Sequence, residues 1–263
     1  MKNINGYDLL AMHYDAWQTD LDEKRRSSYI CRLLKKHGGN RFRKENFPEK
    51  YLCDLGCGTG KTIVSFAKLG FTSIGIDLSE VMLNLAGEHA REEGVSVALS
   101  QQDLRSFRLP EKMDVMLCLT DTINHLTGDK DIPRFFKKVY QNLQSGGFFI
   151  FDFIAPNYFE TILEEKFYYF IDEKRTLFWE NHYSAEKRLN RSDITMFTKS
   201  AGDLYRRDEL EIVERSYLLS EMVDLLTASN LEFCAAYRDM TLISPSEQDH
   251  RVFVVSRKLR VVK

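Results

Sequence analysis

From residue 51 onward, short apolar runs alternate with longer amphipathic runs, and this alternation restricts the fold more than any other feature of the sequence. Strands joined by helices in this way form a parallel sheet with helices on both faces. We therefore expect an α/β three-layer sandwich. Its first five strands are predicted at "YLCDL", "TSIGID", "VSVAL", "DVMLCL" and "FFIFDF".

Three helices are expected between these strands. One runs from Lys61 to Leu69 and one from a cap at Ser79 to Gly94. The third has Asp131 as its cap and stops at Gly146.

Two segments interrupt the alternation. Residues 1–50 begin with the aromatic "YDLLAMHYDAW" and end in the polar "GGNRFRKENFPEK", which predicts a helical cap followed by a loop. Residues 167–215 contain three strand-like segments, which predict an antiparallel β insertion in a core made of 51–166 and 216–263. The insertion leaves the sheet at the carboxyl end of the fifth strand, so we expect a lid over the site there, with a dimer element as the alternative.

The composition is that of a globular protein: 263 residues, 43% hydrophobic and 29% charged, with a net charge of −2. This balance does not favour a nucleic-acid partner. The five cysteines read as reduced, packed thiols, and Cys53 and Cys57 have no second Cys or His pair near them that would complete a metal site. The N-terminus lacks an apolar signal segment. We expect a cytoplasmic protein with no metal and no membrane partner.

The stretch "CDLGCGTGKT", residues 53–62, is a glycine turn at the end of the first strand. A phosphate-binding P-loop would need a glycine where Leu55 stands, and the dinucleotide fingerprint would need its third glycine at Lys61. Both patterns fail by one residue. The remaining G-x-G-x-G turn lets the backbone approach a ligand closely, with the amides of the next helix pointing at it.

Acidic residues end the next two strands. Asp77 follows the second strand, where a carboxylate can accept both hydroxyls of a ribose. Asp103 lies beyond the third strand, where it could accept from an adenine amino group while Leu104 packs on the ring. Each aspartate alone is also compatible with a helix cap. Together they predict an adenosine-like ligand.

With "DLGCGTG" at 54–60, Asp77 and the Asp103-Leu104 pair, the chain resembles class I S-adenosylmethionine-dependent methyltransferases over roughly residues 5–155. The resemblance implies a Rossmann-like seven-stranded sheet in the order 3-2-1-4-5-7-6 with the last strand antiparallel, "LEFCAAY" and "RVFVVSRK" being strands six and seven. It implies S-adenosylmethionine as cofactor, its methionine end held by the glycine loop. The implied contacts are Asp54, Gly56, Cys57, Gly58, Gly60, Asp77, Leu78, Asp103, Leu104 and Leu119.

The fourth strand lacks the Asn/Asp-Pro-Pro-Tyr loop of nucleobase methyltransferases, and the chain lacks the paired-glutamate loop of arginine methyltransferases. "LTDTINHL" at 119–126 and "YDLLAMHYD" instead resemble a small-molecule branch that includes glycine and sugar-amine N-methyltransferases. In that branch a tyrosine closes over the cofactor carboxylate, and Tyr14 is the matching position, with Tyr7 the weaker candidate. The alternative is that both tyrosines pack on the core.

Methyl transfer from a sulfonium mainly requires alignment of the acceptor, the methyl group and sulfur. His125 lies just past the fourth strand and is the candidate general base, or else a structural histidine. Asp121 and Asn124 are candidates to orient the acceptor. In the insertion, aromatic residues line either an acceptor pocket or a core: Trp179, His182 and Tyr183.

We therefore expect metal-independent methyl transfer to a small-molecule amine, hydroxyl or carboxyl acceptor. Two alternatives remain open. One is tRNA modification, supported only by the basic loop around Arg41, Arg43 and Lys44. The other is a non-catalytic module that binds the cofactor.

Overall fold

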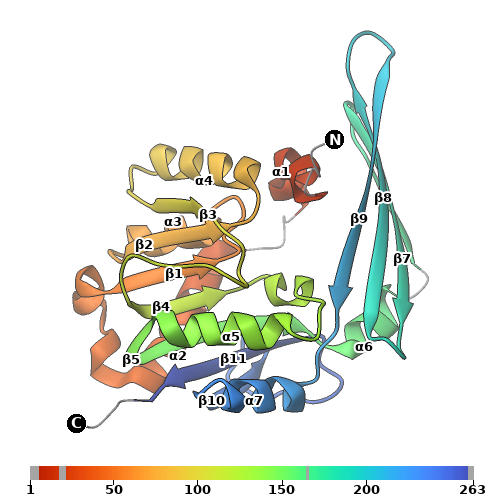
Figure 1. The fold of residues 1–263 in the computed structure, drawn as a ribbon. Helices are drawn as coiled ribbons and strands as arrows, with labels where there is room; N and C mark the ends of the chain where they lie inside the picture. The colour runs from red at the N-terminus through yellow and green to blue at the C-terminus, as the bar shows by residue number, and fades with distance from the viewer. Residues whose placement is uncertain (1–5, 18–21, 164–165, 260–263) are drawn as a thin grey trace.

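A computed structural model describes residues 6–17, 22–163 and 166–259, and its centre is a seven-stranded sheet in the order β10-β11-β5-β4-β1-β2-β3 (Figure 1). β11 runs antiparallel to both β5 and β10, whereas the other neighbours are parallel. This confirms the predicted order 3-2-1-4-5-7-6. The strands are β1 (Tyr51–Leu55), β2 (Thr72–Asp77), β3 (Ala98–Gln101), β4 (Met113–Cys118), β5 (Leu143–Ile154), β10 (Leu231–Arg238) and β11 (Arg251–Lys258).

Helices cover both faces of the sheet, and each face has its own apolar core. Leu33 and Phe66 contribute to the core on one face, and Phe135, Phe136 and Leu226 to the core on the other. Every residue of β4 is buried, as expected for a central strand covered on both sides. The first face carries α2 (Glu23–Gly38), α3 (Lys61–Lys68) and α4 (Glu80–Glu92), and the second carries α5 (Asp131–Asn142) and α7 (Leu219–Ala228).

The N-terminal segment contains α1 (Gly6–Trp17), which precedes α2, and residues 1–5 and 18–21 of the expected cap lie outside the described residues. The stretch predicted as a loop at 38–50 instead forms two short 3-10 helices, η1 (Gly39–Phe42) and η2 (Lys44–Glu49). Phe42 and Phe47 are buried there, which holds the segment against the core.

The insertion is a separate four-stranded antiparallel sheet in the order β6-β7-β8-β9, which we call the arm. It stands beside the core, with α1 between the two (Figure 1). The sequence did not reveal β6, because its aromatic residues are mostly exposed and show no alternation. The arm consists of β6 (Phe167–Ile171), β7 (Arg175–Ser184), β8 (Leu189–Lys199) and β9 (Tyr205–Arg215), and is preceded by α6 (Pro156–Tyr158) and a π-helical turn, η4 (Phe159–Leu163).

The predicted helix ends agree with the structure only in part. Ser79 caps α4, since its hydroxyl accepts from the Met82 N–H at 3.1 Å. Asp131 does not cap α5: Lys130 is the N-cap, and the Asp131 carboxylate accepts instead from the Gly128 N–H at 3.1 Å. α5 ends before the predicted glycine stop, at Asn142, because β5 already begins at the next residue. β3 begins three residues later than predicted.

Candidate functional site

The glycine turn after β1 adopts the left-handed backbone that its glycines permit, with φ of +78° at Gly56, +52° at Gly58 and +83° at Gly60. A Cβ at Gly56 would lie 2.3 Å from the Thr122 side chain, and one at Gly60 would lie 2.6 Å from Ala86 Cβ. A Cβ at Gly58 would meet nothing within 4 Å. Two glycines therefore permit close packing, and the third faces open space.

Asp77 ties this turn to the end of β2. Its carboxylate accepts from the Gly58 N–H at 2.8 Å and from the Ser79 N–H at 2.9 Å. Burial raises the pKa of the Asp77 carboxyl, and hydrogen bonds from the backbone of Ser79, Gly58 and Leu78 oppose that rise. With about four acceptor sites, the carboxylate retains capacity to accept from a ligand.

A cavity of about 310 Å³, which we call the loop cavity, opens above the glycine turn. It brings together residues from the ends of β1, β2 and β4, the loop after β3, α1 and β9, which is the edge where an open parallel sheet binds its ligands. Of the residues predicted from sequence, its lining includes Tyr14, Gly56, Gly58, Asp77, Leu78, Asp103, Leu104 and His125.

Asp103 lines the loop cavity, but its carboxylate is already engaged. The Arg105 side chain donates to both of its oxygens, at 2.9 and 3.1 Å from Nε. This pairing lowers the pKa of the Asp103 carboxyl. An adenine amino group would therefore share this acceptor with Arg105.

A small polar recess, the inner pocket, adjoins the loop cavity at Gly56 and Gly58. Arg26 lies there, buried, and donates to Thr120 Oγ1 at 3.0 Å and to Glu23 at 3.2 Å. Sequence reasoning missed Arg26, although it shares the apolar face of α2 with Ile30 and Leu33, where an arginine is unusual. The predicted residues Asp54, Cys57 and Leu119 also line this pocket, as does Tyr14.

Asp54 is the buried acid at the floor of the inner pocket. Burial and the nearby Glu23 carboxylate raise the pKa of its carboxyl to about 7, against the lowering influence of Arg26.

The loop after β4 is strained and strongly held. Thr120 and Asp121 both have positive φ, +58° and +52°, which is costly for residues other than glycine. Arg251 from β11 holds the second of them, with Nη2 2.7 Å from Asp121 Oδ1, while its other nitrogen pairs with the buried Asp152.

Asn124, predicted to orient the acceptor, is fully buried instead. Its amide donates to the carbonyls of Ile154 and Arg215, at 3.1 and 2.7 Å, and its oxygen accepts from the Ile154 N–H at 2.9 Å. It therefore fastens this loop to β5 and to the base of the arm, and that expectation is wrong.

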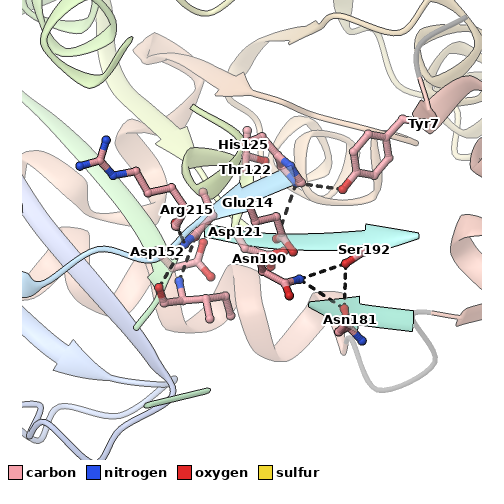
Figure 2. Close-up of polar contacts among 12 residues, drawn as sticks. Tyr7, Asp121, Thr122, His125, Asp152, Asn181, Asn190, Ser192, Glu214 and Arg215 are labelled. Atoms are coloured by element: carbon pink, nitrogen blue, oxygen red, sulfur yellow. Dashed lines mark hydrogen bonds and ion pairs between the residues drawn. The ribbon is translucent and has the colours of Figure 1, made fainter. Parts of the chain in front are cut away.

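His125 contacts both α1 and the arm (Figure 2). Its Nε2 lies 2.8 Å from the Tyr7 hydroxyl and 4.0 Å from Glu214 Oε1. Burial raises the pKa of the Glu214 carboxyl. Asp121, His125 and Glu214 place one potential metal-ligand atom each within 4.8 Å of one another, but the Arg251 guanidinium already pairs with Asp121.

A second cavity, of about 360 Å³, lies between α1, the end of β5 and the arm, and we call it the arm cavity. It shares Tyr7, Tyr14 and Ile212 with the loop cavity. Of these two cavities, His125 lines the loop cavity and Glu214 lines the arm cavity. The lining of the arm cavity also includes Asp121, Tyr158, Phe159, Trp179 and Arg251.

The other two aromatic candidates of the insertion lie elsewhere. His182 is half exposed, and its Nε2 lies 3.4 Å from Asp193 on the outer face of the arm. Tyr183 stacks on Phe159 and hydrogen-bonds Ser216 Oγ at 2.9 Å. Of the three, Trp179 lines the arm cavity.

The positive charge of the basic loop around Arg41, Arg43 and Lys44 is partly neutralised within the protein. Arg41 donates to Asp114 and to the Gly146 carbonyl, both at 2.6 Å. None of the helices among the described residues is both long and apolar enough to cross a membrane.

Comparisons with known proteins agree with this geometry. A family model described as a methyltransferase domain matches residues 52–147. A putative methyltransferase of Geobacillus sp. strain WCH70 is 26% identical over 245 residues, covering 93% of both chains. The putative methyltransferase YqeM of Bacillus subtilis is 26% identical, covering 82% of this chain and 88% of its own.

Solved structures share the fold across nearly the whole chain. An S-adenosylmethionine-dependent methyltransferase from Clostridium acetobutylicum has a TM-score of 0.81 at 24% identity, covering 98% of this chain and 100% of its own. The amino pentose methyltransferase CalS10 from Micromonospora echinaspora, solved with S-adenosylmethionine bound, has a TM-score of 0.67 at 19% identity, covering 98% and 99%. The sugar N-methyltransferase KedS8 from Streptoalloteichus scores 0.73 at 18% identity, covering 99% and 98%.

Proposed function

We propose that this chain, which is an S-adenosylmethionine-dependent methyltransferase, methylates a small-molecule amine held in the arm cavity, without a metal ion. The observation that carries the proposal is the junction of two cavities at Tyr7, Tyr14 and Ile212. A donor in one cavity and an acceptor in the other would meet there, which is the alignment that methyl transfer requires.

The loop cavity and the inner pocket together fit the elongated cofactor. Asp77 would accept the ribose hydroxyls, and Leu104 would cover the adenine beside Asp103. Arg26 would attract the methionine carboxylate, with Tyr14 beside it. The open space at Gly58 leaves room for the ligand to pass from one to the other. When bound, S-adenosylmethionine supplies a methyl group already activated by the positive sulfur.

The chemistry of the arm cavity favours a cationic acceptor. Two carboxylates, Asp121 and Glu214, face one guanidinium, and Arg251 is itself shared with Asp152. Aromatic walls and excess negative charge suit an ammonium group. CalS10 and KedS8, whose names describe amino-sugar and sugar-nitrogen methylation, add support for this class of acceptor.

We further propose that residues 167–215 act as a lid, because Ile212 and Glu214 of β9 form walls of the cavities where transfer would occur. The remaining parts would be the N-terminal cap of residues 1–50 and the core of 51–166 and 216–263. A homodimer through the arm is the competing role, and sedimentation would reveal it.

The test is transfer of labelled methyl groups from S-adenosylmethionine into a metabolite extract and, separately, into bulk tRNA, each with and without a chelator. We expect label on the nitrogen of a small molecule, unchanged by the chelator. Label on tRNA, on oxygen or on carbon would contradict the acceptor class, and loss of transfer with the chelator would contradict metal independence.

A further inference from the structure

We propose that Glu214, which the arm contributes to the site, takes the proton that the acceptor amine loses during methylation. The proposal rests on the amine transfer proposed above. It concerns which side chain handles the proton, a role for which the sequence offered only His125.

The two candidates face different cavities. His125 lines the loop cavity, where the donor would lie, and its Nε2 is 2.8 Å from the Tyr7 hydroxyl. Glu214 lines the arm cavity, where the acceptor would lie. A proton acceptor must be within hydrogen-bond reach of the nitrogen that loses the proton. The position of Glu214 meets this requirement better than that of His125.

The other carboxylate of the arm cavity is less available. Asp121 Oδ1 already accepts from Arg251 Nη2 at 2.7 Å, so this oxygen is engaged with a cation and is less free to approach an acceptor. Among the described residues, the only basic group within ion-pair distance of the Glu214 carboxylate is His125, whose Nε2 lies 4.0 Å from Glu214 Oε1. Figure 2 shows the Glu214 side chain below His125 and next to Asn190.

The surroundings of Glu214 suit a proton acceptor. Its side chain is 12% exposed, and burial is the main reason that its carboxyl pKa is raised. Among its neighbours, Asp121 also raises this pKa, whereas His125, Arg251 and the hydrogen bond from Asn190 lower it. A carboxylate whose pKa moves towards neutrality is a better base near physiological pH.

The proton balance is simple. The acceptor binds as an ammonium ion and gives one proton to the Glu214 carboxylate, which frees the nitrogen lone pair. The nitrogen then forms its bond to the methyl carbon as the carbon–sulfur bond breaks, and the sulfonium becomes a neutral thioether. The methylated amine keeps the positive charge, and the protonated Glu214 returns its proton to solvent when the product leaves.

The experiment compares Glu214→Gln with Glu209→Gln, the same change on the outer, exposed side of β9, where the glutamate pairs with Arg207. The acceptor is the compound labelled in the extract, or its purified equivalent. In wild type we expect kcat/KM to decrease as the pH falls through the raised carboxyl pKa of Glu214. We expect Glu214→Gln to lower kcat about 100-fold and to abolish this decrease. Glu209→Gln should retain both the rate and this acid limb.

A binding measurement supplies a readout without turnover. Calorimetry with the methylated product amine and S-adenosylhomocysteine should show at least 10-fold weaker amine binding in Glu214→Gln, with unchanged affinity for S-adenosylhomocysteine. Glu214→Asp should restore part of both the rate and the acid limb.

A Glu214→Gln variant that keeps the wild-type rate and acid limb would overturn the proposal, as would a His125→Gln variant that loses that limb in its place. The position of the methyl group in the product tests the amine class separately, because an oxygen-methylated product would refute that class whatever Glu214 does. An extract in which nothing is labelled would refute both.

Discussion

The core sheet and the arm present functional groups in different ways. In the core, strands buried on both faces end at one edge, so the ligand meets turns, backbone amides and the few acids placed there. In the arm, side chains alternate between an outer and an inner face, so a functional group is placed by strand register. The core therefore suits recognition of the cofactor by backbone groups, and the arm, if it lines the acceptor site as proposed, would recognise the acceptor through side chains.

The two regions also differ in how they hold charge. Asp54, Asp77 and Asp152 are acids of the core whose carboxyl pKa burial raises. The arm keeps many of its charges in exposed pairs, such as Arg191 with Asp193. We expect the core to lose stability when these buried acids ionise, and the exposed ion pairs of the arm to contribute little to that loss.

The largest effect should come from Asp54. Its carboxyl pKa is about 7 in the folded protein against about 4 in the unfolded chain, so the unfolded state releases this proton first as the pH rises. Stability should fall between about pH 4 and pH 7, by up to about 4 kcal/mol at this site. Asp54→Asn should flatten that fall in urea titrations across this range, and Asp193→Asn in the arm should not. If the free energy of unfolding falls with pH equally steeply in wild type and Asp54→Asn, the proposed difference between core and arm is wrong.

Alanine at a left-handed glycine should be the next largest change, and it should depend on the region. At Gly60 the added Cβ would lie 2.6 Å from Ala86 Cβ at φ +83°, which predicts a loss of about 3 kcal/mol. At Gly202, in the turn between β8 and β9, φ is +58° with nothing within 4 Å, which predicts about 1 kcal/mol. Denaturant unfolding measures both, and similar losses at the two sites would show that backbone strain outweighs packing.

The smallest effect concerns affinity within the core. Asp77→Asn should weaken S-adenosylhomocysteine binding by about 10- to 100-fold, because a charge-assisted contact to the ribose and the brace on Gly58 are both weakened. Asp103→Asn should cost only a few-fold, because Arg105 already holds that carboxylate. Calorimetry measures both affinities. An unchanged affinity in a folded Asp77→Asn variant would show that Asp77 does not bind the ribose.

The sequence predicted the core well because its signals are local. The glycine turn and Asp77 lie within one strand-helix-strand unit, so their spacing predicts the strand ends on which they lie. Arg26 was missed because its partners, Thr62 and Thr120, are far from it along the chain.

Glu214 was missed for a different reason. Leu210 and Ile212 face inward, and the same alternation places Glu214 on the inner face. The sequence therefore contained the signal, as an acid at an inward position. It could not reveal that Tyr7 and His125 would lie beside that position, because this depends on how the arm packs against the core.

The position of α1 has a kinetic consequence. Tyr7 lines both cavities, Asp8 accepts from the Ser79 hydroxyl of the core, and Leu10 packs with Leu177 and other apolar residues of the arm. If donor and acceptor occupy the cavities as proposed, α1 forms part of the wall around both. We therefore expect movement of that helix to accompany the exchange of both products, so that release of the spent donor contributes to the turnover rate alongside the chemical step.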